Sequence, residues 1–261
     1  MKYIFTYPAQ IIYHFIRYLG ALSLLLYETV CWIFVPPFKG ERILCQMMRV
    51  GPGSFFIASL ISLFMGMIMA LQMASLMVEM NAEIYIPSIV AISLTRELAP
   101  VLTSLIVAGR IGAGITAELG SMVVTEQVDA LKAFAVNPVK YLVVPRFLAL
   151  IIMLPLLTVF ADIIGIVGGF LICVFKLYIN PALYMTMVVQ ALEIRDVSTG
   201  LIKTLMFGVV IAMVGCYEGL NIRGGSEGVG KATTASVVIS FILIIMVDCV
   251  FTTMFYFIFG V

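Results

Sequence analysis

Long apolar runs, each broken by few polar positions, dominate the pattern along this chain. Five runs are long enough to cross a bilayer as helices, which takes about 20 residues, and they are too continuous for barrel strands. The five predicted spans are residues 54–78, 84–109, 147–175, 197–217 and 235–261. Only helices and closed barrels satisfy backbone groups in lipid, so the pattern predicts an all-α polytopic membrane protein.

The segment before the first span, residues 9–35, is apolar but less regular. Polar residues such as His14, Arg17 and Glu28 recur on one stripe at helical spacing, and Trp32 suits the headgroup region. We expect an amino-terminal helix lying in the cytoplasmic interface. A sixth span is the alternative interpretation.

The composition supports a membrane protein with a single domain over residues 1–261. The chain is 63% hydrophobic and 11% charged, whereas soluble domains carry about 25% charged residues. A net charge of +1 gives no reason to expect nucleic-acid binding. The five cysteines show no paired spacing and His14 is the single histidine, so we expect neither a metal site nor a catalytic constellation.

Basic residues collect on one side of the predicted topology. That side holds Lys2, Arg17, Lys39, Arg42, Arg49, Arg110, Lys132, Lys140, Arg146, Arg223 and Lys231. The positive-inside rule therefore places the amino terminus in the cytoplasm, and five spans place the carboxyl terminus outside.

Arg96 and Glu97 are the two charges of the second span and the most informative residues of the chain. Inserting a charged side chain near the middle of a span costs about 2.5–3.5 kcal/mol on insertion scales. Such charges persist where they face protein, water or a substrate. Asp162 and Asp248 lie inside other spans, where they are protonated, hydrogen-bonded or paired with Arg96. Lys203 is expected to snorkel to the interface in a structural role.

A short amphipathic helix is predicted at residues 125–135, in the cytoplasmic loop. Val128, Leu131 and Phe134 share its apolar face, while Glu126 lies elsewhere on the helix. That face needs lipid headgroups, its own bundle or a partner protein to cover it.

Two further patterns invite a functional interpretation. The stretch 225–231 has P-loop spacing, but Ala232 replaces the magnesium-binding hydroxyl and no strand precedes it, so a flexible glycine-rich turn is expected. Methionines recur every four residues from Met65 to Met77, with Met80 one turn further. Their adaptable side chains suit mixed acyl chains, and ordinary helix packing is the equal alternative.

From Arg96 onward, a series of motifs resembles the MlaE family, the permease subunits of Mla/MCE-type ABC lipid transporters. The motifs are Arg96-Glu97-Leu98-Ala99-Pro100-Val101, Ala108-Gly109-Arg110-Ile111-Gly112, Ala117-Glu118-Leu119-Gly120-Ser121-Met122, Glu126-Gln127-Val128-Asp129-Ala130, Pro138, Pro145-Arg146, the stretch 226–233 and Asp248.

The resemblance implies a homodimer that encloses a phospholipid cavity, with an ABC ATPase dimer on its cytoplasmic side. The ATPase, which binds ATP and Mg²⁺, would dock on the coupling helix through Glu126, Val128, Leu131 and Phe134. A periplasmic MCE-domain hexamer would exchange lipid with the permease, often with a small STAS-domain subunit. The cavity residues carried over by the resemblance are Arg96, Glu97, Met69, Leu76, Met77 and Met80.

The expected function is therefore transport rather than catalysis. The chain would move phospholipids between the bacterial inner membrane and a periplasmic carrier, maintaining outer-membrane lipid asymmetry, while a separate chain hydrolyses ATP. The alternative is an ion- or proton-coupled secondary transporter with Glu97, Asp162 and Asp248 as a relay, although no pair of broken helices in corresponding halves is evident.

Overall fold

The computed structural model describes residues 2–36 and 40–259, and every regular element in them is helical. The α-helices are α1 (Lys2–Ile33), α2 (Gly40–Met77), α3 (Ile86–Ser93), α4 (Ala99–Val107), α5 (Ala113–Val124), α6 (Gln127–Ala133), α7 (Val144–Phe175), α8 (Pro181–Ala191), α9 (Ile194–Leu220) and α10 (Gly225–Phe259). The predicted all-α architecture is confirmed.

The predicted spans coincide with longer helical stretches, except that the first span, 54–78, ends one residue after α2. The second span, for instance, belongs to a continuous helical stretch from Glu83 to Val124. Helical hydrogen bonding continues beyond the apolar window because backbone groups need the same partners in the headgroup region. The last two residues of the fifth predicted span lie outside the described residues.

The stretch formed by α3, α4 and α5 is interrupted by two π-helical segments, Leu94–Leu98 and Ala108–Gly112. A third π-helical segment, Val139–Val143, leads into α7. Such segments insert an extra residue into a helical turn and often mark functional positions. Each of the three carries basic residues, and the first carries Arg96 beside Glu97.

Helices α2 and α7 pack closely because their contact surfaces consist of small residues. A Cβ on Gly66 would lie 1.9 Å from the carbonyl oxygen of Gly165, so only glycine permits this approach. Ser62 donates a hydrogen bond to the carbonyl of Ala161 across the same contact. The backbone contact matches the small-residue packing typical of membrane helices.

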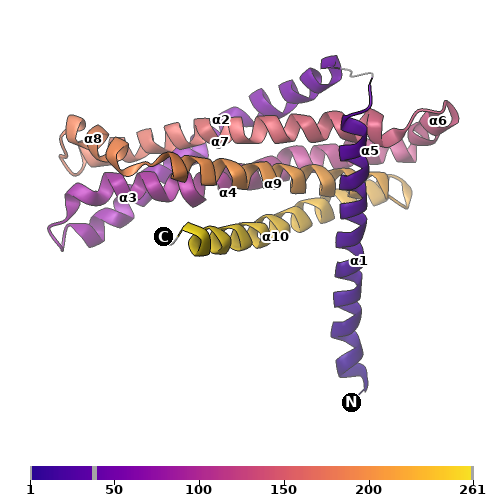
Figure 1. Ribbon diagram of the computed structural model, residues 1–261, viewed down its shortest axis with the longest axis horizontal. Coiled ribbons are helices and arrows are strands. Elements are labelled where there is room, and N and C mark those ends of the chain that lie inside the picture. The colour runs from indigo at the N-terminus through magenta and orange to yellow at the C-terminus, as the bar shows by residue number, and fades with distance from the viewer. Residues whose placement is uncertain (1, 37–39, 260–261) are drawn as a thin grey trace.

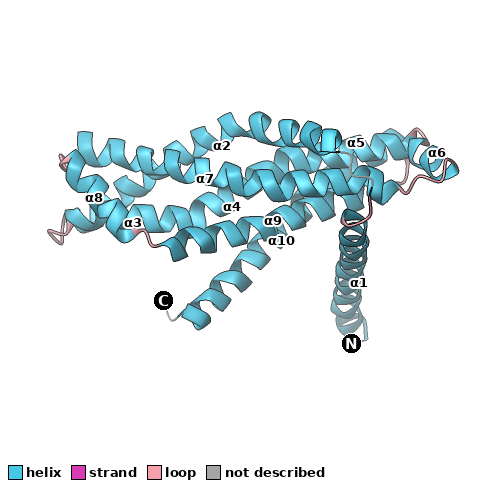
Figure 2. Cartoon of the chain, turned by 45° about the horizontal axis from the view of Figure 1, so that its top comes forward, coloured by secondary structure: helices cyan, strands magenta, loops and turns pink. Residues whose placement is uncertain are grey.

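Helix α1 runs across the other long helices rather than along them, in both views of the molecule (Figure 1, Figure 2). By length and composition, six helical stretches of the described chain can cross a membrane, and Phe15–Ile33 of α1 is the first. A helix perpendicular to the spans lies parallel to the membrane plane. The orientation therefore favours the interfacial interpretation of α1.

The two ends of the bundle carry one short helix each. Helix α8 lies at one end and α6 at the other (Figure 1). Helix α6 falls inside the predicted segment 125–135, whereas α8 was not predicted. Asn180 caps α8 by accepting a hydrogen bond from the backbone N–H of Ala182, a preferred helix start. On the predicted topology, α8 belongs to the outer side.

Candidate functional site

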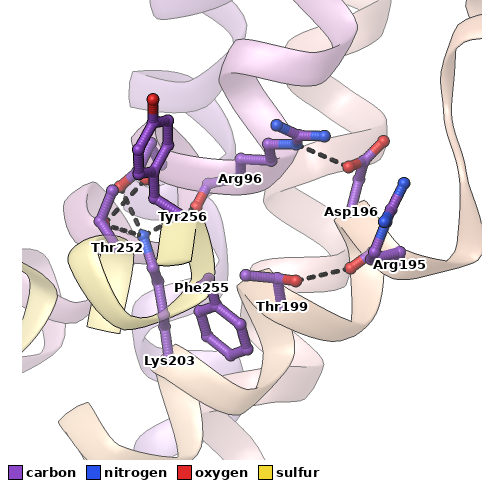
Figure 3. A pocket seen from close by; sticks show the side chains of 9 residues that line it. Arg96, Arg195, Asp196, Thr199, Lys203, Thr252, Phe255 and Tyr256 are labelled. Carbon is purple, nitrogen blue, oxygen red and sulfur yellow. Dashed lines mark hydrogen bonds and ion pairs between the residues drawn. The ribbon is translucent and has the colours of Figure 1, made fainter. Parts of the chain in front are cut away.

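Charged side chains from three helical stretches meet at the α8 end of the bundle. Arg96 and Glu97 come from the first π-helical segment, Asp196 and Lys203 from α9, and Asp248 from α10. Figure 3 shows how Lys203 and Arg96 project from neighbouring backbones toward different partners. We call these five residues the charged cluster.

Local backbone features bring α9 against the π-helical segment. Pro100 has no N–H to donate to the carbonyl of Arg96 four residues earlier, and Lys203 Nζ donates to that carbonyl at 3.3 Å. A Cβ on Gly200 would lie 2.3 Å from the carbonyl oxygen of Thr95, so glycine is required for this close approach. Pro100 thus leaves the Arg96 carbonyl free of its own N–H, and Gly200 lets α9 approach closely enough for Lys203 to reach that carbonyl.

Lys203 is the centre of the charged cluster. Its Nζ lies 2.6 Å from Glu97 Oε2 and 3.0 Å from Asp248 Oδ1, and it donates to Thr252 Oγ1 at 2.7 Å. Thr252 in turn donates to Glu97 Oε1 at 3.0 Å. Since only 1% of the lysine side chain is exposed, the prediction that Lys203 snorkels to the interface is wrong.

Arg96 pairs with a carboxylate that sequence reasoning did not single out. Its Nε donates to Asp196 Oδ1 at 2.6 Å, and the Asp196 side chain is 2% exposed. The other oxygen of Asp196 accepts the backbone N–H of Glu193 in a capping box at the start of α9. The helix cap therefore orients the carboxylate that holds Arg96.

Arg96 and Glu97 consequently point to different partners. Adjacent residues on a helix project about 100° apart, so a direct pair between them was not required. Asp248 lies against Lys203 rather than Arg96. Among the described residues, no hydrogen bond or ion pair joins Asp162 to the charged cluster, and its buried Oδ1 has no hydrogen-bond partner.

A cavity of about 110 Å³ opens beside the charged cluster. Its lining comprises Arg96, Glu97, Arg195, Asp196, Thr199, Lys203, Thr252, Phe255 and Tyr256. The cavity is thus lined both by residues of the charged cluster and by aromatic side chains of α10. Within the described part of the chain, no group of three or more histidine, cysteine, aspartate or glutamate side chains is placed to hold a metal ion.

The predicted methionine surface lies on α2, with Met80 in the turn that follows it, and none of its residues lines this cavity. Met69 and Met77 are partly buried against an apolar cluster formed with α3, α7 and α8. Leu76 and Met80 are largely exposed, at 57% and 70%. Within a single chain, the structure does not bring these four residues together with Arg96 and Glu97 in one cavity.

The predicted coupling residues have unequal surroundings. Val128 is buried in the core and Leu131 packs against it, so the bundle itself covers much of the apolar face of α6. Phe134 is 81% exposed. Glu126 precedes the helix in a left-handed conformation, with φ of 59°. Phe134 is therefore the apolar side chain left for a partner.

The P-loop-like stretch is not the turn that the sequence suggested. Helix α10 begins at Gly225 and contains the stretch, with Lys231 paired to Glu227 one turn earlier at 2.7 Å. The turn between α9 and α10 covers residues 221–224, and Gly224 and the first helical residue, Gly225, have positive φ values. A regular helix does not form the phosphate-binding loop of an ATPase.

Comparisons with known proteins cover most of the chain. Residues 43–254 match the family model described as Permease MlaE. A probable ABC transporter permease protein of Rickettsia prowazekii is 43% identical over 242 residues, which cover 93% of each chain. A protein of the same description from Synechocystis is 44% identical over 199 residues, 76% of each chain.

A plant relative extends the comparison. The protein named TRIGALACTOSYLDIACYLGLYCEROL 1, chloroplastic, of Arabidopsis thaliana is 35% identical over 213 residues. The match covers 81% of this chain and 60% of the plant protein.

Proposed function

Because the chain belongs to the MlaE family of ABC transporter permeases, we propose that its transported substrate is a phospholipid. In this proposal two copies of the chain form the permease in the bacterial inner membrane, with the amino termini in the cytoplasm. Lipid passes between that membrane and a periplasmic MCE-domain hexamer, and the transport maintains the lipid asymmetry of the outer membrane.

The proposal assigns ATP hydrolysis to a separate chain. An ABC ATPase dimer, with its ATP and Mg²⁺, docks on α6 from the cytoplasm, and a STAS-domain subunit is a further expected partner. The exposed Phe134 offers the ATPase an apolar contact at that end of the bundle. The helical conformation of the P-loop-like stretch supports assigning nucleotide binding elsewhere.

The observation that carries the lipid proposal is the position of Arg96. Arg96 lines the cavity, and its bond to Asp196 engages Nε. Among the described residues, no hydrogen bond or ion pair engages its two Nη groups. A guanidinium binds phosphate through two parallel hydrogen bonds. Arg96 therefore provides a preorganised donor pair for a lipid phosphate inside the membrane.

Lys203 serves a different purpose from Arg96. Glu97 and Asp248 already surround its ammonium group, and Thr252 accepts a further hydrogen bond from it. The lysine is thus occupied by carboxylates, while Arg96 keeps donors for a ligand. Glu97 also keeps negative charge at the cavity, which limits how tightly a phosphate is held and favours its release.

The methionine surface of α2 provides the apolar part of the proposal. Unbranched thioether side chains adapt to acyl chains of varied shape, and the partly exposed Met69 and Met77 lie on one face of the helix. In the proposed dimer, this surface and the charged cluster contribute to a shared cavity.

The alternative relay of Glu97, Asp162 and Asp248 receives less support from the geometry. Glu97 and Asp248 meet at Lys203, but no hydrogen bond or ion pair of the described residues joins Asp162 to either of them. A relay would need these three carboxylates to exchange protons along a connected path. The cluster is better explained as the polar end of a lipid cavity.

Photo-crosslinking tests the lipid proposal in cells. A photoreactive amino acid at Met69 or Met77 should capture phospholipid more efficiently than one at Ile163, a 55% exposed position of α7 that serves as the bulk-lipid control. Mass spectrometry of the crosslinked chain measures the yield. Equal capture at the three positions would show that the methionine surface contacts only bulk lipid or protein.

A further inference from the structure

A second, larger cavity lies at the opposite end of the bundle from the charged cluster. Its volume is about 410 Å³. The end of α1, the start of α2 and the segment between α6 and α7 surround it, and its walls are mostly apolar. On the positive-inside topology this end faces the cytoplasm.

Two cations line the second cavity, and each contacts an aromatic ring. The guanidinium carbon of Arg42 lies 3.5 Å from the centre of the Tyr141 ring. Lys140 Nζ lies 5.3 Å from the centre of the Trp32 ring and donates to the carbonyl of Pro36 at 3.0 Å. The rings orient the cations without neutralising them.

Neither cation has a carboxylate partner in the part of the chain that the structure describes. Ion pairs engage Arg49, Arg96 and Arg146, for example, but neither Arg42 nor Lys140. The nearby carboxylate of Glu28 accepts a hydrogen bond from Asn137 at 3.3 Å instead. The second cavity therefore combines apolar walls with two cations that no ion pair of the described residues engages.

This combination matches a ligand with an anionic head and apolar chains. Tryptophan and tyrosine are typical of the headgroup level of a bilayer, and the cytoplasmic leaflet is the anionic one. We propose that the second cavity binds an anionic phospholipid of the cytoplasmic leaflet, with its phosphate on Arg42 and Lys140 and its acyl chains along the apolar walls. The site is separate from the proposed transport cavity and does not depend on it.

The single tryptophan of the chain makes the proposal measurable, because Trp32 lines this cavity. The full chain is reconstituted in nanodiscs that contain equal fractions of phosphatidylglycerol and phosphatidylcholine. Bromine is carried on the acyl chains of one lipid or the other. Bromine quenches tryptophan at short range, so the ratio of the two quenching efficiencies reports which lipid lies beside Trp32.

We expect brominated phosphatidylglycerol to quench wild-type Trp32 more strongly than brominated phosphatidylcholine. A cation near the membrane surface contributes about fivefold to the preference for an anionic lipid. Arg42→Gln and Lys140→Gln should each lower the quenching ratio by about that factor, and the double variant should bring it near one. Arg17→Gln removes an exposed cation of α1 distant from the cavity and should leave the ratio unchanged.

The charge-conserving double variant Arg42→Lys/Lys140→Arg should retain the preference, which separates lost charge from altered folding. Circular dichroism and size-exclusion chromatography check that the variants stay folded. Equal quenching by both lipids in the wild type would overturn the proposal. So would an unchanged ratio in Arg42→Gln/Lys140→Gln. Loss of the preference in inorganic phosphate, but not in sodium chloride of the same ionic strength, would also overturn it, because it would indicate a site for soluble phosphate.

Discussion

Two helix contacts in this protein both place a glycine against a backbone carbonyl, but only one of them brings charged side chains together. At the contact between α2 and α7, Gly66 lies against a backbone carbonyl, and no ion pair crosses the contact among the described residues. Where α9 meets the π-helical segment Leu94–Leu98, Gly200 also lies against a carbonyl. There, however, the close approach brings buried Lys203 to Glu97.

The comparison indicates that the contact between α2 and α7 supports the fold, whereas the contact of α9 with the π-helical segment forms part of the candidate site. The small-residue contact gains stability from close packing and from the hydrogen bond of Ser62 to the carbonyl of Ala161. The charged contact must offset the cost of removing ions from water, and well-packed apolar residues in place of a buried ion pair are often at least as stable. A charged contact beside a cavity is therefore better explained by ligand handling than by folding.

The largest effect is expected for Lys203→Met. This change leaves Glu97 and Asp248 without their shared cation, and breaking a buried ion pair typically costs about 3–5 kcal/mol. The midpoint of thermal unfolding in detergent should fall sharply. The triple variant Lys203→Met/Glu97→Gln/Asp248→Asn should recover most of the stability without recovering lipid transport. A triple variant that transports lipid normally would mean that the charges are not functional.

Gly66→Val should destabilise the protein by about 1–3 kcal/mol or more, as overpacking does. The added side chain would press on the carbonyl of Gly165 and separate α2 from α7. Unfolding in detergent measures the loss. Gly114→Ala is the control, since its Cβ would meet nothing within 4 Å. Wild-type stability in Gly66→Val would contradict the packing described for this contact.

Phe134→Ser should weaken ATPase binding while the fold persists, because Phe134 is exposed. Val128→Ser should instead lower the stability of the permease, because Val128 lies in the core. An apolar side chain of this size contributes about 1.5–3 kcal/mol when fully buried. Co-purification of the ATPase and thermal unfolding give the two measurements. If the two variants behave alike, the division of the α6 face between bundle and partner is wrong.

The sequence predicted the long helices, and Arg96 and Glu97 as residues of the site, for a clear physical reason. Apolar runs and charges inside them reflect the demands of lipid, which act locally along the chain. The pairing of Arg96 with Asp196 depends on how α9 docks, and residues 100 positions apart leave no periodic signal. Lys203 did offer a signal, since it is the single charge of the predicted span 197–217.

Two other features, helix α8 and the helical start of α10, were not predicted from the sequence either. Helix α8 is short and lies outside the predicted spans, so hydropathy did not separate it from a loop. The glycine-rich start of α10 suggested a turn because glycine disfavours helices by about 1 kcal/mol per residue. An ion pair of Glu227 with Lys231 and the long helix that follows accompany the helical conformation there.

The most direct test of the central claim is lipid occupancy after charge reversal at Arg96. The permease is purified with its ATPase as wild type, Arg96→Glu and Lys176→Glu, the last being an exposed cation at the same end of the bundle. Extracted phospholipid per complex is measured by mass spectrometry. The account predicts that Arg96→Glu keeps the ATPase bound but loses most of its phospholipid, while Lys176→Glu matches the wild type. Full phospholipid occupancy in folded Arg96→Glu complexes would contradict it.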